Sequence, residues 1–192
     1  MNDRFKIVKE VIEMRRSVKP VQMNGQRIMD EQVKELLQLA DWAPTHGYTE
    51  PWRFIVFSRP QDFCSKHAEL YKENTPESDF QQLNYEKYLH MGDKASHVVV
   101  AVMQRGNLAK IPVLEEVAAT ASAIQNILLG ATAAGIASFW STGGLTYHQA
   151  LKDWLQLREE DQVMGLIYLG YSDKPASTGR RNINLEEKID WR

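Results

Sequence analysis

The alternation of apolar and polar residues along the chain predicts helices interleaved with strands. Apolar side chains that recur every three or four positions are typical of amphipathic helices, and short, almost continuous apolar runs are typical of buried strands. Helices are therefore expected at residues 3–14, 30–43, 60–72, 114–135 and 146–155, and strands at 52–57, 97–104, 135–140 and 163–171. The polar, tyrosine-rich stretch 73–91 has weak periodicity, and it is expected to form an excursion or lid.

The loop 44–51 joins the second helix to the first strand and has a proline at each end. Pro44 ends the helix, because it disfavours helical geometry in the residue before it and has no amide hydrogen to donate. Between Pro44 and Pro51 lie His46, Glu50 and other polar or aromatic residues. Loops held by regular elements often carry ligand contacts, but an ordinary connection between a helix and a strand fits this pattern equally well.

This order of elements indicates an α+β fold rather than a doubly wound nucleotide-binding fold. The latter requires a glycine-rich turn between its first strand and the following helix. Here Phe57 is followed by Ser58, Arg59 and Pro60, without glycine. No linker, repeat or low-complexity run divides the sequence, so we expect one domain over residues 1–192, an α+β sandwich in which helices flank a mixed central sheet.

The predicted helix 114–135 carries small or aliphatic residues on nearly every face. A helix of this kind is buried on most sides, either at the centre of a domain or inside a dimer interface. The C-terminal tail also carries apolar residues, among them Ile189 and Trp191. Because exposing a large apolar side chain to water is unfavourable, we expect the tail to pack against something, such as a second subunit.

Composition and charge exclude several classes of function. The formal net charge of −2 and the isoelectric point near 6.2 give no electrostatic basis for binding nucleic acid or an anionic membrane. Cys64 is the single cysteine, so neither an internal disulfide nor a cysteine-based metal site is expected. The charged N-terminus is not a secretory signal, and no apolar run approaches the roughly 20 residues of a membrane span. We expect a soluble, cytoplasmic protein.

Two basic clusters are candidate anion sites. The first, at the end of the N-terminal helix, consists of Arg15, Arg16, Ser17 and Lys19, and the second is the pair Arg180 and Arg181. Guanidinium groups match phosphate oxygens in geometry and charge, and a serine hydroxyl adds a donor. Each cluster also has a structural interpretation, the first as a basic cap that complements the helix dipole and the second as a solvated charge pair.

The turn that follows the third predicted strand is another candidate site. Ser141, Thr142, Gly143 and Gly144 separate this strand from the next helix. Such turns expose backbone amide groups, and glycine lets a ligand approach closely. Trp140, just before the turn, could lie against a flat ring, although a single tryptophan in a strand is more often part of a core.

No catalytic side chain can be identified. The five histidines lack the spacing of zinc ligands, and no nucleophile with a base and an orienting acid is recognisable. The pairs Glu115–Glu116 and Glu186–Glu187 are interpreted as solvated helix charges. Sites for an anion and a ring, without a catalytic side chain, are typical of an enzyme whose cofactor supplies the chemistry.

Four segments, in order, resemble the FMN-dependent nitroreductase family. They are Arg15-Arg16-Ser17-Val18-Lys19; Ala43-Pro44-Thr45-His46 with Glu50-Pro51-Trp52-Arg53-Phe54-Ile55-Val56; Phe139-Trp140-Ser141-Thr142-Gly143; and the tail from Leu169 through Arg181 to Trp191. Each motif is weak alone, but the order and spacing match over essentially the whole chain. The loop that contains His46 is similar to the short, single-domain branch of the family.

The resemblance implies a homodimer with one FMN at each of two sites across the subunit interface, and a C-terminal arm lying on the partner. It also implies NAD(P)H as the electron donor and ping-pong turnover, in which hydride reduces the flavin before a nitroaromatic, quinone or similar small-molecule acceptor is reduced. The cofactor-binding residues that it implies are Arg15, Arg16, Ser17, Lys19, His46, Trp140, Ser141, Thr142, Gly143 and Arg181.

The resemblance further implies a role for each of these residues. Arg15 and Ser17 would hold the FMN phosphate and ribityl chain, with Arg16 adjacent and Arg181 (or Arg180) closing the site. Lys19 would lie near flavin N1 and O2, and the backbone of residues 140–143 would face the ring near N5. His46 would reach the flavin from the partner subunit. A cation near N1 and O2 stabilises the negative charge of a reduced flavin.

Four positions depart from the family pattern. Glu50 stands in place of a glutamine, Tyr48 in place of an asparagine, and Ser141 and Trp42 in place of arginines. A flavin-binding or flavin-storage protein of the same fold, without nicotinamide turnover, is therefore a second hypothesis. A third is a dimer without flavin, in which the basic clusters are structural. The physiological acceptor and the choice between NADH and NADPH stay open.

Overall fold

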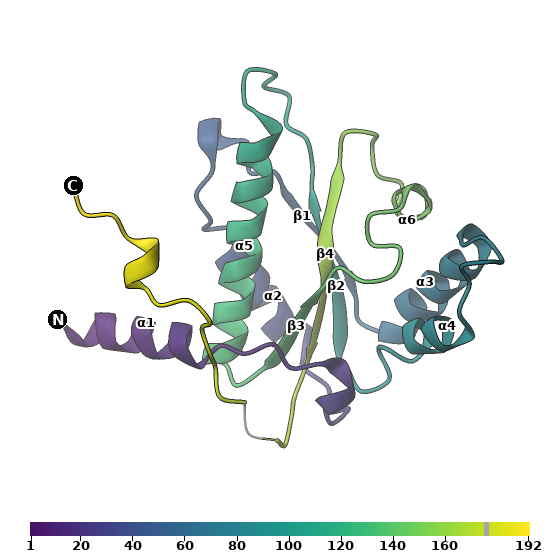
Figure 1. The fold of residues 1–192 in the computed structure, drawn as a ribbon, viewed down its shortest axis with the longest axis horizontal. Coiled ribbons are helices and arrows are strands. Elements are labelled where there is room, and N and C mark those ends of the chain that lie inside the picture. Colours follow the sequence, from purple (N-terminus) through teal and green to yellow (C-terminus); the bar gives the residue numbers. More distant parts are fainter. Residues whose placement is uncertain (175–176) are drawn as a thin grey trace.

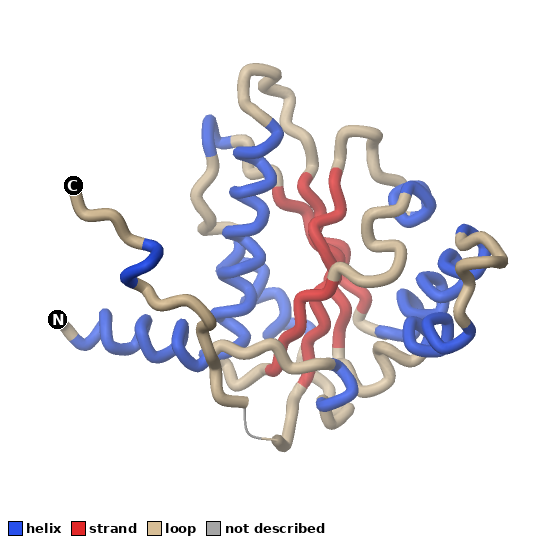
Figure 2. The backbone as a smooth tube through the Cα atoms, in the orientation of Figure 1, coloured by secondary structure: helices blue, strands red, loops and turns tan. Residues whose placement is uncertain are grey.

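The computed structural model describes residues 1–174 and 177–192. A four-stranded sheet with the strand order β1-β2-β4-β3 forms its centre (Figures 1 and 2). The strands are β1 (Trp52–Phe57), β2 (His97–Met103), β3 (Ala137–Ser141) and β4 (Gln162–Gly170). The strands predicted from the apolar runs are thus confirmed, with small shifts at their ends.

Helices cover both faces of the sheet. The helices of the described chain are α1 (Asp3–Met14), α2 (Asp30–Ala40), α3 (Pro60–Asn74), α4 (Gln82–Leu89), α5 (Val113–Ala133) and α6 (Gln149–Trp154), with 3-10 turns at Pro20–Gln22, His46–Tyr48 and Glu186–Lys188. Helix α4 lies in the tyrosine-rich stretch, and the rings of Phe80 and Tyr88 pack against Tyr71 of α3. The predicted excursion is therefore held against α3 by aromatic contacts.

The prediction of a mixed sheet is wrong, because every ladder of the described sheet is antiparallel. Helix α5 connects two strands, β2 and β3, that run in the same direction. Strand β4 lies between them and pairs antiparallel with both, so β2 and β3 form no parallel ladder. Strand order depends on tertiary packing, which the alternation of helices and strands in a sequence does not reveal.

Alternate residues of the central strands fill two separate cores. From β2, Val99 and Ala101 pack toward α2 and α5, whereas Val98 and Val100 pack toward α3 and α6. Both faces of β2 are therefore buried, which explains its continuous apolar sequence. The predicted inner face of α2 is confirmed, since residues such as Leu36 belong to the first core.

Two segments near the chain ends project from the body of the molecule (Figures 1 and 2). Helix α1 buries none of its side chains, and its apolar residues Phe5, Ile7 and Ile12 are exposed. The C-terminal tail extends on the same side of the molecule, and Trp191 is 90% exposed. The packing expected for this tryptophan is therefore not made within one chain.

Helix α5 is buried on one side within a single chain. Ile124 and Ile127 are fully buried against the sheet and α2, whereas Leu114 remains 77% exposed. The burial on most sides that the sequence predicts is thus incomplete in one chain. Among the described residues, no helix combines the length and apolar character needed to cross a bilayer. The expected cytoplasmic location and the single domain over residues 1–192 stay predictions.

Candidate functional site

The N-terminal basic segment runs along the outer edge of β3. Ser17 forms an isolated parallel bridge with Ser138, and the Val18 amide donates a hydrogen bond to the Ser138 carbonyl oxygen at 2.9 Å. Strand β3 is an edge strand, and the backbone groups of a bare edge lack partners. The pairing brings residues 15–19 beside the end of β3, so two distant sequence motifs meet in space.

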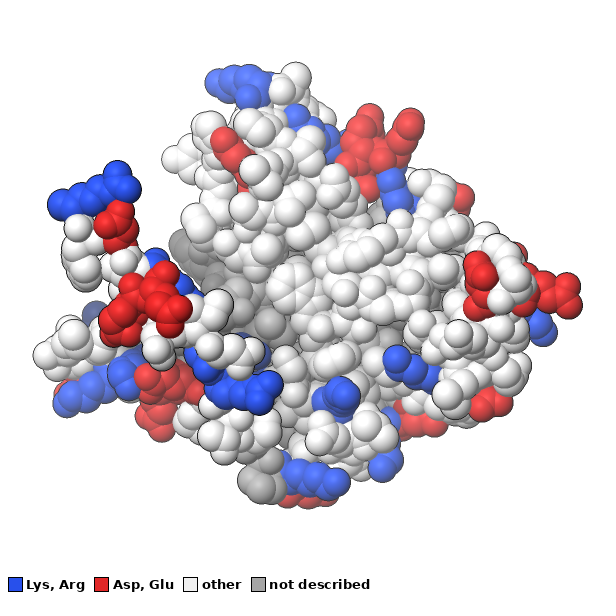
Figure 3. Space-filling view, viewed as in Figure 1, with Lys and Arg blue, Asp and Glu red and all other residues white. Residues whose placement is uncertain are grey.

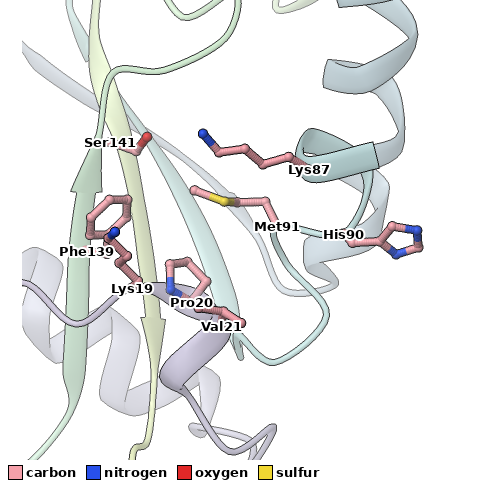
Figure 4. Close-up of a pocket in the computed structure, with 8 residues that line it drawn as sticks. All are labelled: Lys19, Pro20, Val21, Lys87, His90, Met91, Phe139 and Ser141. Atoms are coloured by element: carbon pink, nitrogen blue, oxygen red, sulfur yellow. The ribbon is translucent and has the colours of Figure 1, made fainter. Parts of the chain in front are cut away.

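A cavity of about 390 Å³ opens where these two motifs meet α4 (Figure 4). Sites for small molecules usually enclose roughly 300–1,000 Å³. The cavity is lined by Lys19, Pro20, Val21, Lys87, His90, Met91, Phe139 and Ser141. In Figure 4 the side chain of Lys87 extends toward Ser141, whereas the ring of His90 points away from the cavity.

The chemistry of the cavity is that of an apolar slot with cationic groups at its margin. Met91 and Phe139 supply apolar walls, and Lys19 and Lys87 supply the charge. In the part of the chain that the structure describes, neither lysine pairs with a carboxylate. This combination suits a flat, largely apolar ligand that carries negative charge on one edge.

The turn after β3 is held in one shape beside this cavity. The Gly143 amide donates to Ser141 Oγ at 3.3 Å, and the Thr146 hydroxyl donates to the Gly143 carbonyl oxygen at 2.6 Å. Helix α3 adds a contact from outside the turn, since the Leu145 amide donates to His67 Nε2 at 3.1 Å.

The Trp140 side chain does not line the cavity. It packs into the core beside α2 and α5, on the face of the sheet opposite Phe139, and its indole donates to the Met164 carbonyl oxygen at 3.0 Å. The interpretation of Trp140 as a core residue is therefore confirmed. Its backbone, at the end of β3, remains the part that can face a ligand.

The Arg16 guanidinium is committed to backbone oxygens. It donates to the carbonyls of Ser177 at 2.8 Å, Glu13 at 2.6 Å and Arg15 at 2.8 Å. Arg16 therefore ties the tail to the end of α1. In the described residues no such contact occupies the Arg15 guanidinium, so Arg15 is the better candidate for holding an anion.

Arg16 also brings the second basic cluster toward the first. The backbone of Gly179 lies so close to the Arg16 guanidinium that a Cβ at this glycine would collide with it. Arg180 and Arg181 follow directly and are exposed. The structure therefore brings the two basic clusters into the same region, although Arg181 itself contacts only the Arg180 carbonyl oxygen, at 2.9 Å, among the described groups.

His46 is not part of this region within one chain. Its Nδ1 lies 2.5 Å from Glu115 Oε2, near the start of α5, whereas Arg16 lies beside Thr132 near the end of the same helix. At about 1.5 Å per residue, the stretch of helix from Glu115 to Thr132 is roughly 25 Å long. His46 is therefore far from the basic segment at Arg16, and it does not line the cavity.

The interpretation of Glu115 and Glu116 as solvated charges is wrong for Glu116. Its side chain is 1% exposed and forms an ion pair with Arg105. The Gly106 amide donates to Glu116 Oε1 at 3.1 Å. The sequence analysis did not predict this pair. The position of Glu116 at the start of the buried face of α5 could have indicated that its side chain is buried.

The buried ion pair organises the loop 104–112 after β2. Arg105 also donates to the Ile111 carbonyl oxygen at 2.7 Å, which closes the loop on itself. The side chains of Leu108 and Ile111 then pack against Gly47, next to His46. The Arg105–Glu116 pair thus stabilises the loop against which the 3-10 turn with His46 packs.

The loop 44–51 has unusual backbone geometry. Tyr48 and Glu50 have positive φ angles of 53° and 42°, which non-glycine residues rarely adopt. Tyr48 is also 90% exposed, and Trp42 just before the loop is 86% exposed. Because strained, exposed residues often mark binding sites, this geometry favours a functional loop over an ordinary connection.

The remaining histidines have structural partners. His97 Nε2 lies 3.0 Å from Asp30 Oδ1, and His90 Nδ1 lies 3.0 Å from Asp93 Oδ2. Among the described residues, no group of histidine, cysteine, aspartate and glutamate side chains could hold a metal ion.

His67 makes the stability of the fold dependent on pH. Burial lowers its pKa from 6.5 to about 4, so the folded protein resists the protonation that the unfolded chain accepts. Its contribution is complete above pH 6.5 and is lost as the pH falls toward 4, since protons then favour the unfolded state. We expect the free energy of unfolding to fall by about 2 kcal/mol between pH 7.5 and 5 from this residue alone.

Urea unfolding at the two pH values measures this effect, with His67→Gln as the matched control. Glutamine does not titrate, so the difference between wild type and variant isolates His67 from the other titrating groups. An equal loss of stability in both proteins would contradict the prediction.

Known proteins resemble this chain over most of its length. A model of the nitroreductase family matches residues 12–171. The YfhC protein of Bacillus subtilis, named as a candidate NAD(P)H nitroreductase, is 26% identical over 179 residues, which cover 91% of this chain and 89% of that protein.

Solved structures share the fold over almost their full length. A nitroreductase-like family protein from Bacillus cereus superposes with a TM-score of 0.78 at 24% identity, covering 96% of this chain and 95% of that one. A protein from Desulfovibrio desulfuricans that is named as a candidate nitroreductase, in complex with FMN, gives 0.73 at 24% identity, covering 100% and 98%. The FMN-dependent nitroreductase NfnB from Mycobacterium smegmatis, in complex with NADPH, gives 0.74 at 20% identity, covering 99% and 100%.

Proposed function

Because this chain belongs to the nitroreductase family of NAD(P)H oxidoreductases, we propose that it is an FMN-dependent enzyme that passes electrons from NAD(P)H to nitroaromatics, quinones or similar small molecules. The observation that carries the proposal is the cavity between Lys19, Phe139 and Ser141. It lies at the meeting point of the N-terminal basic segment, the turn after β3 and α4.

The residues of this region fit FMN. The apolar walls suit the flat ring, and the uncompensated charge of Lys19 suits the ring edge that becomes negative on reduction. Arg15 and the Ser17 hydroxyl lie on the same segment and suit the phosphate and the ribityl chain. When bound, FMN would accept hydride from NAD(P)H and donate electrons to the acceptor. The protein's part is to bind, orient and shield the ring.

The remaining assigned residues divide into two groups. Ser141 lines the cavity, and the backbone of residues 140–143 would face the ring, while Arg181 or Arg180 would close on the phosphate from the tail that Arg16 holds. His46 would reach the ring only across a subunit boundary, with Glu115 holding its Nδ1.

A homodimer is part of this proposal, with the C-terminal arm lying on the partner. The support is the apolar surface that one chain leaves exposed on α1, on α5 and on the tail, including Phe5, Leu114 and Trp191. The centre of the face seen in Figure 3 is almost free of charged residues, which gather around its margin. Large uncharged surfaces of this kind are typical of subunit interfaces.

The Arg15→Ala variant is expected to weaken FMN binding. Loss of a charge-assisted hydrogen bond to phosphate removes roughly 1.5–3 kcal/mol, or about 10- to 150-fold in the dissociation constant. Titration followed by flavin fluorescence measures this constant. Arg4→Ala, which removes an exposed arginine from α1, is the control and should leave it unchanged. An unaltered dissociation constant for Arg15→Ala would exclude Arg15 from the phosphate site.

The proposed function is tested by the visible absorption spectrum of the purified protein, recorded before and after anaerobic addition of NADH or NADPH. Flavin bands that bleach support a reductase and identify its donor. Bands that persist with both donors contradict the reductase and favour the alternative, a flavin-binding protein without nicotinamide turnover. The departures at Trp42, Glu50 and Ser141 are the observations that favour this alternative. Absence of flavin bands even after FMN is added would contradict both.

A further inference from the structure

The imidazole of His67 contacts the turn after β3 directly. The ring is buried, with 2% of the residue exposed, between Phe63 and Tyr88, whose ring centroids each lie 5.3 Å from its own. Its Nε2 accepts the hydrogen bond of the Leu145 amide at 3.1 Å. The amide is partly buried, and without this acceptor it would lose its partner within the protein, which is unfavourable.

The backbone of Gly144 is shaped to this imidazole. Its φ angle is +67°, and a Cβ at this position would lie 2.6 Å from His67 Cε1 and 2.8 Å from Nε2. The Tyr88 ring also packs against this position, with Cε1 3.2 Å from where the Cβ would stand. The turn is therefore held by α3 through His67 and by α4 through Tyr88, and the residue before Tyr88, Lys87, lines the cavity.

We propose that His67 is a positioning residue for the flavin site, because it fixes the turn 141–145 through the Leu145 amide and thereby sets the wall of the cavity at Ser141. This inference rests on the proposed function, since it concerns the same site. His67 does not touch the cavity and acts only through the turn.

The protonation state of His67 is consistent with this role. Burial holds the pKa of His67 at about 4, so Nε2 remains an acceptor at neutral pH. The phenol that faces it, Tyr88, has a pKa that burial raises, so it is neutral as well. The contact is therefore maintained over the whole neutral range.

Two substitutions at the same position separate positioning from simple packing. His67→Gln keeps an acceptor near the place of Nε2, whereas His67→Leu keeps the apolar volume and removes the acceptor. In the protein without flavin, hydrogen exchange of the Leu145 amide is expected to become at least about tenfold faster in His67→Leu and to change little in His67→Gln. This measurement requires no cofactor.

The second readout is the dissociation constant of FMN at pH 7.5, measured by flavin fluorescence. We expect it to rise about tenfold or more in His67→Leu, and to stay within about threefold of wild type in His67→Gln. The midpoint potential of the bound flavin should shift in the same variant, because the backbone that faces the ring has moved. A packing defect alone would lower the unfolding midpoint without this difference between the two variants.

Gly144→Ala provides a second test if His67→Leu does not fold. The added Cβ displaces the turn while the imidazole stays in place, so FMN binding should weaken as in His67→Leu. Unchanged exchange at Leu145 or unchanged FMN affinity in the folded variants would overturn the inference. Failure of the wild-type protein to bind FMN would instead overturn the proposed function, and the exchange result would still stand on its own.

Discussion

Replacing Arg105 by leucine is expected to lower the free energy of unfolding by about 3–5 kcal/mol at pH 7. The substitution leaves the carboxylate of Glu116 buried, with 1% of its side chain exposed, and with the Gly106 amide as its one donor among the described residues. A buried charge without its partner is much less stable than the same charge in water. The loop 104–112 would also lose the hydrogen bond from Arg105 to Ile111.

The pH dependence of this loss identifies its cause. Without Arg105, the penalty comes from the negative charge of the buried Glu116 carboxylate, and a protonated carboxyl group does not carry this charge. The penalty should then be largest at neutral pH and shrink as the pH falls toward about 4, the ordinary pKa of a glutamate. Urea unfolding at pH 7 and pH 5 measures this trend, and a loss of equal size at both values would contradict it.

The Arg59→Leu variant is the matched control for Arg105→Leu. Arg59 pairs with Asp62 at 2.8 Å, but both side chains are largely exposed, so its loss should cost at most about 1 kcal/mol. The double variant Arg105→Leu/Glu116→Leu should be more stable than Arg105→Leu alone, because it leaves no buried charge. If all three variants unfolded alike, the buried pair would have no special role.

The helices and strands could be predicted because their apolar positions follow the geometry of each element. In α2, residues such as Val33 and Leu36 recur at helical spacing, and in β2 the continuous run from His97 reports burial on both faces. The strand order could not be predicted in the same way. The position of β4 between β2 and β3 is decided by packing between distant segments, and no local pattern records it.

The two motifs of the candidate site could be predicted from the sequence, but the residues that hold the neighbouring loops in place could not. The basic segment and the turn after β3 are visible as motifs, and the structure brings them together at Ser17 and Ser138. His67 and Glu116 are polar residues on helices, and their type alone suggests exposure. Their spacing relative to buried residues, however, indicates burial. His67 shares a helical face with Phe63 and Tyr71, both buried, and Glu116 lies four residues before Thr120, which is also buried.

Substituting alanine for Gly165 is expected to lower the free energy of unfolding by about 2–6 kcal/mol. Its φ angle of +145° is strained for any residue with a Cβ, which costs about 1–3 kcal/mol. The added methyl group would also collide with the indole of Trp140 and lie 3.0 Å from the Ser141 carbonyl oxygen. Overpacking of this kind costs another 1–3 kcal/mol or so. Thermal and urea unfolding of the variant measure the total.

The Gly135→Ala variant separates the two contributions to the Gly165 effect. Gly135 also has a positive φ, of +68°, but no atom of the described residues lies within 4 Å of the position of its Cβ. Its substitution should therefore cost only the backbone strain, about 1–2 kcal/mol. The excess at Gly165 reports the contacts with Trp140 and with the Ser141 carbonyl oxygen, and Trp140→Leu should relieve part of it in the double variant. Equal losses at Gly135 and Gly165 would show that the indole does not press on β4.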